Sequence, residues 1–228
     1  MLSPARQSLY TAKGIPCKYR LVLIGDTNVG KSSLMQAQIH KKFNPHPEPT
    51  IGAAFGFICR DFPLMGISLS VEMWDSAGQE RYRAYTMNYL RNAHVVLIVY
   101  DLSSLASLES IAVNWIPYLE RHSELLAPDC IKILVGNKSD LHLGLPAKEQ
   151  QIIQREGREL ALTNNLLYAE VSSLTRVGLD DLFDDIFDKL CQKASRGCGG
   201  EDRNVIKLTE QGTKKSCSAS EQMKKCSS

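Results

Sequence analysis

Short apolar runs recur along the chain, and stretches with helical spacing separate them. Most of the runs carry few polar side chains, which is typical of strands covered on both faces of a sheet. One run differs because its apolar residues alternate with polar ones, which indicates a single buried face. The predicted strands are residues 18–25, 53–62, 67–74 (the alternating run), 95–101, 131–137 and 166–172.

Helical patterns fall between these strands. Strands that alternate with helices imply βαβ crossovers, which build a mainly parallel sheet with helices on both faces. The runs 53–62 and 67–74 follow each other directly, so we expect them to pair as a hairpin. The prediction is an α/β fold with a six-stranded, mainly parallel sheet and one antiparallel edge strand. The predicted helices are residues 31–42, 81–91, 104–121, 149–163 and a last one that starts at Leu179.

The patterning stops after about residue 192, and this divides the chain. We expect an N-terminal extension at 1–17, a globular domain at 18–192 and a disordered tail at 193–228, which is too polar to bury enough apolar surface. The net charge of +2 hides an asymmetry, because the tail holds eight Lys and Arg against four Asp and Glu. The tail therefore carries about +4 and the remainder about −2.

Several classes of protein are disfavoured by composition. Apolar runs fall short of the roughly 20 residues that span a bilayer. The N-terminus lacks the apolar centre of a secretory signal, so we expect a cytosolic chain. Nucleic acid is not an expected partner, because the basic excess is confined to the tail and lacks interleaved aromatic residues.

Residues 25–33, GDTNVGKSS, fit the phosphate-binding pattern G-x-x-x-x-G-K-[ST] and lie between a predicted strand and a predicted helix. The glycines allow backbone N–H groups to face phosphates, and the following helix directs its dipole at negative charge. Lys31 is expected to bind phosphate oxygens, and the Ser32 hydroxyl to bind Mg²⁺. The nucleotide-binding residues predicted here are Gly25, Thr27, Asn28, Val29, Gly30, Lys31, Ser32 and Ser33.

Two later motifs also follow predicted strands, where open α/β sheets bind ligands. In WDSAGQE, residues 74–80, Asp75 is expected to hold the metal through a water, and the Gly78 amide to sense a γ-phosphate. In NKSD, residues 137–140, Asp140 is expected to accept hydrogen bonds from N1 and N2 of guanine. Adenine lacks these donors, so the motif predicts a preference for GTP over ATP.

Within the second motif, Asn137 is expected to help bind the nucleotide. The Lys138 stem is expected to pack on the guanine face, and an ordinary surface lysine is the alternative. Asp101 ends another predicted strand, but we assign it a turn or a helix cap and no role toward the nucleotide.

These motifs, in this order and together with TIGAAF at 50–55, resemble the Ras superfamily of small GTPases, and within it the Rab branch, over residues 18–192. The TIGAAF segment is most similar to early-endosomal Rabs. The resemblance implies a P-loop NTPase fold and a GTP/GDP switch in vesicle traffic. It also implies an exchange factor, a GAP, a GDP-dissociation inhibitor and effectors as partners. The implied location is the cytoplasmic face of endomembranes, at endosomes, with a cytosolic form when extracted.

The resemblance also implies residue roles. Thr50 binds Mg²⁺ and the γ-phosphate, and Gln79 orients the attacking water, with Gly78 and Lys31 completing the catalytic set. Phe43 lies in the nucleotide site. The loop that backs the base is formed by Ser172, Ser173 and Leu174. Effectors contact Phe55, Trp74 and Tyr89, for which a place in the core is the alternative.

Two departures concern the nucleotide. Leu174 stands where the family usually has lysine, so we expect a somewhat weaker affinity for guanine. Thr27 stands where Ras has glycine, and slow intrinsic hydrolysis is expected. Two alternatives remain open, a nucleotide-holding scaffold without hydrolysis and a member of another Ras branch. A P-loop kinase or ATPase is disfavoured by NKSD.

A third departure concerns the membrane. The chain ends in KKCSS, so Cys226 is third from the end and does not form a CaaX box. Lysine pairs lie close to Cys226 and to Cys217, and such basic segments attract anionic lipid. We hypothesise that Cys226 is prenylated and that Cys217 is acylated as a second anchor.

Overall fold

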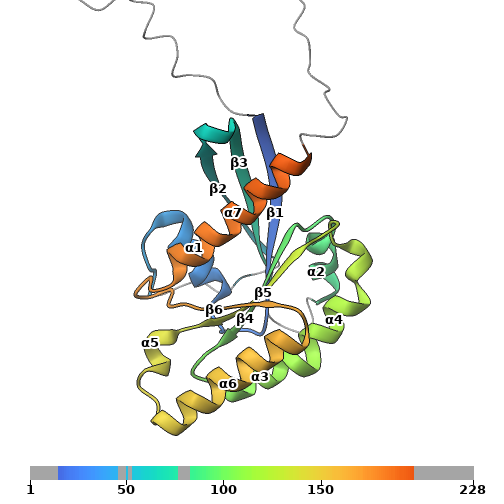
Figure 1. The fold of residues 1–228 in the computed structure, drawn as a ribbon. Coiled ribbons are helices and arrows are strands. Elements are labelled where there is room, and N and C mark those ends of the chain that lie inside the picture. Colours follow the sequence, from blue (N-terminus) through green and yellow to red (C-terminus); the bar gives the residue numbers. More distant parts are fainter. Residues whose placement is uncertain (1–14, 46–49, 51–52, 77–82, 198–228) are drawn as a thin grey trace, which may run out of the picture.

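The computed structural model describes residues 15–45, 50, 53–76 and 83–197 of the chain. Within these residues, strands form one sheet in the order β2-β3-β1-β4-β5-β6 (Figure 1). The strands are β1 (Ile15–Ile24), β2 (Ala53–Phe62), β3 (Ile67–Ser76), β4 (Val95–Asp101), β5 (Ile131–Asn137) and β6 (Leu167–Glu170). The helices are α1 (Lys31–His40), α2 (Arg83–Leu90), α3 (Leu105–Ser110), α4 (Ile116–Arg121), α5 (Ser139–His142), α6 (Ala147–Thr163) and α7 (Leu179–Gly197).

The pairing confirms the predicted fold class. β2 runs antiparallel to β3 from Ala53 opposite Ser76 to Phe62 opposite Ile67, and a short 3₁₀ turn at Pro63–Met65 joins the two strands. The other neighbouring strands pair in parallel. The sheet is therefore mainly parallel, with β2 as its antiparallel edge.

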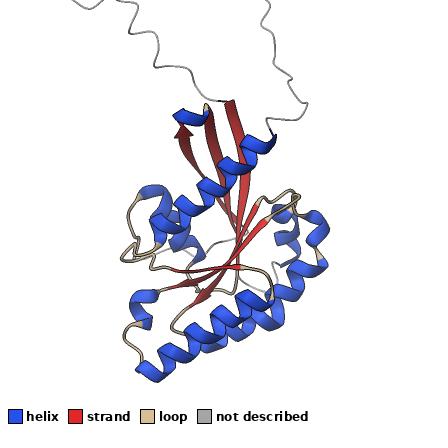
Figure 2. Ribbon diagram, viewed as in Figure 1, coloured by secondary structure: helices blue, strands red, loops and turns tan. Residues whose placement is uncertain are grey.

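Helices cover both faces of the sheet (Figure 2). Alternate residues of β1 show how the layers divide. Leu21 and Leu23 pack in one buried cluster with apolar side chains of α1 and α7. Val22 and Ile24 pack in a second cluster with side chains of α2, α3, α4 and α6. β1 and β4 are parallel neighbours, so their carboxyl ends lie side by side at one edge of the sheet. Loops that follow several strands converge at that edge.

Several predicted boundaries were wrong, and the largest differences concern β1, α7 and β6. β1 begins at Ile15, where its N–H donates to Gly66 O at 2.7 Å, so residues 15–17 belong to the sheet and not to the N-terminal extension. α7 continues to Gly197, past residue 192, because Ala194 still packs in the core cluster. β6 is shorter than the run 166–172. Among the described helices, none combines the length and the apolarity that a bilayer crossing requires.

The predicted helix at 104–121 is interrupted. A π-helical turn at Ile111–Trp115, labelled η4, lies between α3 and α4. Pro117 lies directly after this turn, near the start of α4, and has no backbone N–H to donate to the preceding helical residues. π-helical turns shift the side chains beyond them around the helix axis, and they often lie at functional sites.

Candidate functional site

The loop between β1 and α1 is shaped for close backbone approach. Gly25 and Gly30 have φ angles of 141° and 93°. A Cβ atom on Gly25 would lie 2.1 Å from Val99 O, and one on Gly30 would lie 2.3 Å from Asn137 Nδ2. Glycine is therefore required at both positions, as the phosphate-loop prediction expects. In the described part of the chain no side chain caps the N-terminus of α1, so its N–H groups are available for an anion.

Lys31 is almost completely buried beneath this loop. Its Nζ donates to Gly25 O at 3.0 Å and to Asp26 O at 2.7 Å. Burial lowers the pKa of Lys31, and the charges of Asp75 and Asp26 oppose that change only in part. The ammonium form therefore carries a desolvation cost that a phosphate anion would offset.

Three oxygen-bearing side chains converge beside Lys31. Ser32 Oγ lies 2.5 Å from Asp75 Oδ2 and 2.8 Å from Thr50 Oγ1, and Thr50 Oγ1 lies 3.2 Å from Asp75 Oδ2. Neighbouring ligands in an octahedral site with bonds near 2.1 Å are about 3.0 Å apart, so the hydroxyl oxygens of Ser32 and Thr50 fit two adjacent Mg²⁺ ligands. Asp75 lies beside both hydroxyls, where it can hold a metal-bound water.

The carboxylate of Asp75 is poised for a cation. Its side chain is fully buried, and burial raises its pKa, against the hydrogen bond from Ser32, the charge of Lys31 and the hydrogen bond from Thr50. Its Oδ1 is buried without a hydrogen-bond partner among the described residues. Such an orphaned oxygen favours a metal-bound water as its partner. The residues predicted to hold the metal are therefore brought together.

A cavity of about 300 Å³ opens next to the phosphate loop. Segments far apart in the sequence form its walls, and most of the lining residues were predicted from the motifs; Pro45 and Leu141 were not. The lining residues are Asn28, Gly30, Ser33, Phe43, Pro45, Asn137, Lys138, Asp140, Leu141, Ser173 and Leu174.

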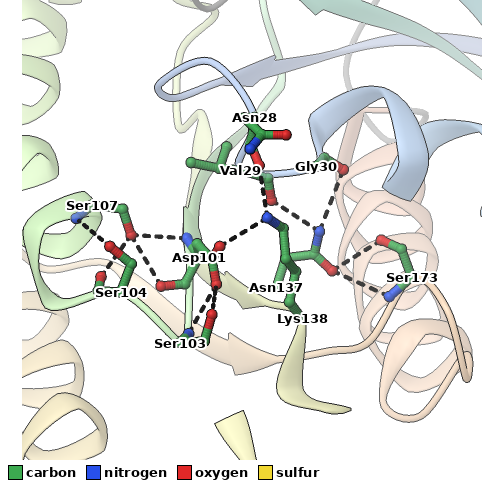
Figure 3. Close-up of polar contacts among 10 residues, drawn as sticks. All are labelled: Asn28, Val29, Gly30, Asp101, Ser103, Ser104, Ser107, Asn137, Lys138 and Ser173. Carbon is green, nitrogen blue, oxygen red and sulfur yellow. Dashed lines mark hydrogen bonds and ion pairs between the residues drawn. The ribbon is translucent and has the colours of Figure 1, made fainter. Parts of the chain in front are cut away.

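The Asn137 side chain forms hydrogen bonds with two walls of this cavity, the phosphate loop and the 172–174 loop (Figure 3). Its Nδ2 donates to Val29 O at 3.0 Å and to Gly30 O at 3.3 Å. Its Oδ1 accepts from the Ser173 N–H at 3.1 Å and from the Ser173 hydroxyl at 2.9 Å. Since Asn137 is 1% exposed, these bonds hold the phosphate loop and the 172–174 loop at a fixed separation.

The Lys138 side chain forms an ion pair with Asp101, to which the sequence analysis assigned no role toward the nucleotide. Its Nζ donates to Asn28 O and forms an ion pair with Asp101 Oδ2, both at 2.8 Å (Figure 3). Asp101 also forms the predicted turn, since its Oδ1 accepts from the Ser103 N–H at 2.9 Å. The predicted turn is thus confirmed, and the ion pair adds a contact with Lys138 that the sequence did not predict. Asp101 ends β4 and lies opposite Asn137 in the sheet register.

Asp140, the residue predicted to read guanine, is oriented by the opposite loop. Ser172 Oγ donates to Asp140 Oδ1 at 2.5 Å and accepts from the Thr175 N–H at 3.0 Å. Ser172 is fully buried, so the carboxylate is fixed in direction before any base binds.

Leu174 gives the cavity an apolar edge, at the position where the family that the sequence resembles usually has lysine. It is 52% exposed, and Leu141 on the neighbouring wall is 53% exposed. We expect Leu174→Lys to slow GDP dissociation about 3- to 10-fold, because a lysine stem covers more of the base. Release of a fluorescent GDP analogue measures this.

The control for that substitution is Leu162→Lys, which changes an exposed leucine on α6 outside the cavity lining. Equal release rates for the parent chain and both variants would contradict the role given to position 174.

The remaining predicted residues divide into two groups. Gly78, Gln79, Cys217 and Cys226 lie outside the described residues. Phe55, Trp74 and Tyr89 form an aromatic row, with ring centroids 4.9 Å apart for the first pair and 5.2 Å for the second. Phe55 is exposed, whereas Trp74 and Tyr89 pack partly against the core, so the row has features of both alternatives.

Comparisons with known proteins agree with this geometry. The family model described as the Ras family matches residues 20–192. The GTP-binding protein ypt5 of Schizosaccharomyces pombe is 39% identical over 191 residues, which cover 82% of this chain and 85% of that protein. The Ras-related protein RABA1b of Arabidopsis thaliana is 34% identical over 191 residues, 82% of each chain. RABA5d of the same plant is 34% identical over 178 residues, 78% of this chain and 76% of that one.

Proposed function

Because this chain belongs to the Ras family of small GTPases, and within it to the Rab branch, we propose that it is a magnesium-dependent GTP/GDP switch in vesicle traffic that slowly hydrolyses GTP. The observation that carries this proposal is the cavity at which the phosphate loop, the 137–140 segment and the 172–174 loop meet. Asp140 and Lys138 lie on its wall, each oriented by another side chain, and Asp140 selects guanine by accepting from its N1 and N2 donors.

The same residues support a role for magnesium. Ser32, Thr50 and Asp75 would hold Mg²⁺, which would supply positive charge to neutralise phosphate oxygens. Thr50 precedes β2, and Asp75 lies at the end of β3 just before Gly78. Ligation by Thr50 and contact of Gly78 with a γ-phosphate would therefore hold the segments on both sides of the hairpin, and hydrolysis would release both.

Hydrolysis itself is assigned to Gln79, which would orient the attacking water. Little covalent chemistry is required of the protein, and an arginine supplied by a GAP adds about 10⁵ in rate for such enzymes. Slow turnover without a partner suits a timed switch.

We expect Gln79→Leu to lower single-turnover GTP hydrolysis about 10- to 100-fold while GTP still binds, because the substitution removes the group that positions the water. Phosphate release from purified, GTP-loaded protein measures the rate, with and without a GAP.

The outcome separates the open alternatives. A parent chain that binds GTP but releases no phosphate under any condition supports the non-hydrolysing scaffold. Competition of GTP against ATP for the cavity, measured with a fluorescent nucleotide, tests the ATPase alternative, which requires equal or better displacement by ATP.

Partners are proposed from the Rab branch. An exchange factor, a GAP, a GDP-dissociation inhibitor and effectors are expected, with the row of Phe55, Trp74 and Tyr89 as the effector surface. Proteins retained by the Gln79→Leu form and not by a Ser32→Asn form, which favours GDP by weakening Mg²⁺ binding, identify the effectors. Retention of the same proteins by both forms argues against a GTP-dependent switch.

Membrane attachment is proposed through the basic tail that follows α7. Prenylation of Cys226, with acylation of Cys217 or the lysine pairs as a second signal, supplies the two contributions that stable anchoring needs. The proposed location is the cytoplasmic face of endosomal membranes, with a cytosolic form when extracted. Failure of a labelled isoprenoid to enter the full chain in cells, with unchanged membrane sedimentation of Cys226→Ser, rejects this attachment.

A further inference from the structure

The phosphate loop contains a carboxylate at its second position. Asp26 follows Gly25, and its backbone oxygen accepts a hydrogen bond from Lys31 Nζ at 2.7 Å. Its negative charge also acts on the buried Lys31 ammonium. A free carboxylate beside that ammonium would compete with phosphate for it, so the direction of the Asp26 side chain matters for a loop that binds anions.

A tryptophan fixes that direction. Trp115 Nε1 donates to Asp26 Oδ1 at 2.8 Å. The Trp115 side chain is fully buried in the cluster of α2, α3, α4 and α6 on one face of the sheet, whereas Lys31 belongs to α1 on the opposite face. The hydrogen bond therefore turns the carboxylate toward the Trp115 side of the loop.

The backbone around Trp115 is unusual. Trp115 is the last residue of the π-helical turn η4, and the edge of its ring packs against Tyr118 at a centroid distance of 5.9 Å. A π-helical turn adds one residue to a turn of the helix. The side chains that follow it therefore point in directions different from those in an uninterrupted α-helix. Trp115 ends this turn, and its indole N–H reaches the phosphate loop at Asp26.

We propose that Trp115 is a positioning residue for nucleotide binding, which holds the Asp26 carboxylate away from Lys31 and so keeps the ammonium free for phosphate. This inference rests on the proposed nucleotide site and adds a residue of the opposite sheet face to it. Without the indole donor, Asp26 turns toward Lys31 and forms an ion pair that phosphate must displace.

The test compares Trp115→Phe in two backgrounds of the full-length chain. With Asp26 present, we expect a fluorescent GDP analogue to dissociate about 10-fold faster, since a hydrogen bond to a charged group is lost. In an Asp26→Asn background, Trp115→Phe is expected to change the rate less than about 2-fold, because the competing charge is absent. Equal acceleration in both backgrounds, or none in either, overturns the proposal.

A packing lesion provides the control. Leu108→Ala removes a buried side chain of α3 and the same core cluster, without a hydrogen bond to the loop. It is expected to lower the unfolding temperature at least as much as Trp115→Phe, with the same change in GDP release in both backgrounds. If the change in GDP release caused by Leu108→Ala also depended on Asp26, the dependence would reflect a general effect of helix packing. That result would contradict the inference.

A second route is available if Trp115→Phe does not fold. Asp26→Glu keeps the charge but lengthens the side chain, and it is expected to release GDP faster than Asp26→Asn. Equal rates for these two variants overturn the proposal. A parent chain that binds no guanine nucleotide instead rejects the proposed function itself, so the two failures are distinguishable.

Discussion

Asp140→Asn should weaken GTP binding about 10⁴-fold and make xanthosine triphosphate the better ligand. In the proposed complex, guanine presents two N–H donors to the Asp140 carboxylate. The asparagine side chain of the variant would place its own NH₂ opposite one of these donors, so two donors would face each other without an acceptor. Xanthine carries a carbonyl in place of the amino group, so the amide pairs with it. Titration of both nucleotides against the purified variant measures the change.

The geometry around Asp140 makes this substitution informative. Ser172 Oγ donates to Asp140 Oδ1, and an asparagine oxygen at the same place still accepts that bond, so the loop remains supported. Asp181→Asn, on the exposed side of α7, is the matched control and should leave both affinities unchanged. Undiminished GTP binding by Asp140→Asn would mean that the base is read elsewhere.

Lys31→Met should lower affinity for GTP about 10³-fold while the free energy of unfolding of the nucleotide-free protein changes by only about 1 kcal/mol. Lys31 is 5% exposed and burial lowers its pKa, so the empty site gains little from the charge. With nucleotide bound, the same charge would face phosphate oxygens in a site shielded from water, as proposed above. Affinity and stability are thus expected to respond separately.

Two measurements check this separation. Nucleotide titration gives the affinity, and urea unfolding of the nucleotide-free forms gives the stability. Lys148→Met, at an exposed position of α6, controls for loss of a positive charge. A large loss of stability in nucleotide-free Lys31→Met would show that Lys31 chiefly supports the fold.

Local sequence signals were sufficient for most of the fold. The apolar runs predicted all strands of the described sheet, because a strand covered on both faces needs apolar residues at nearly every position, as in β4. Element ends were less well predicted. α7 extends to Gly197 because Ala194 packs against the core, and tertiary contacts of that kind leave no mark in the composition of the tail.

Side-chain partners separated by long stretches of chain were beyond sequence reasoning. Asp101 was taken as a turn former, and it is one, but its second oxygen also pairs with Lys138. In the sequence, Trp115 is only one position of a predicted helix. In the structure it ends a π-helical turn, and its indole N–H donates to Asp26. In both cases the partner is chosen by the packing of separate elements.

The sequence by itself determined the order of strands and helices, the glycines of the phosphate loop and the chemical types that bind a guanine nucleotide, because periodicity, backbone freedom and functional groups are properties of neighbouring residues. The tertiary structure alone decided how those groups are oriented. Asn137 joins two loops, Ser172 aims Asp140, and Ser32, Thr50 and Asp75 meet within hydrogen-bond distance. Such distances depend on how the sheet brings the carboxyl ends of its strands together, which no single segment encodes.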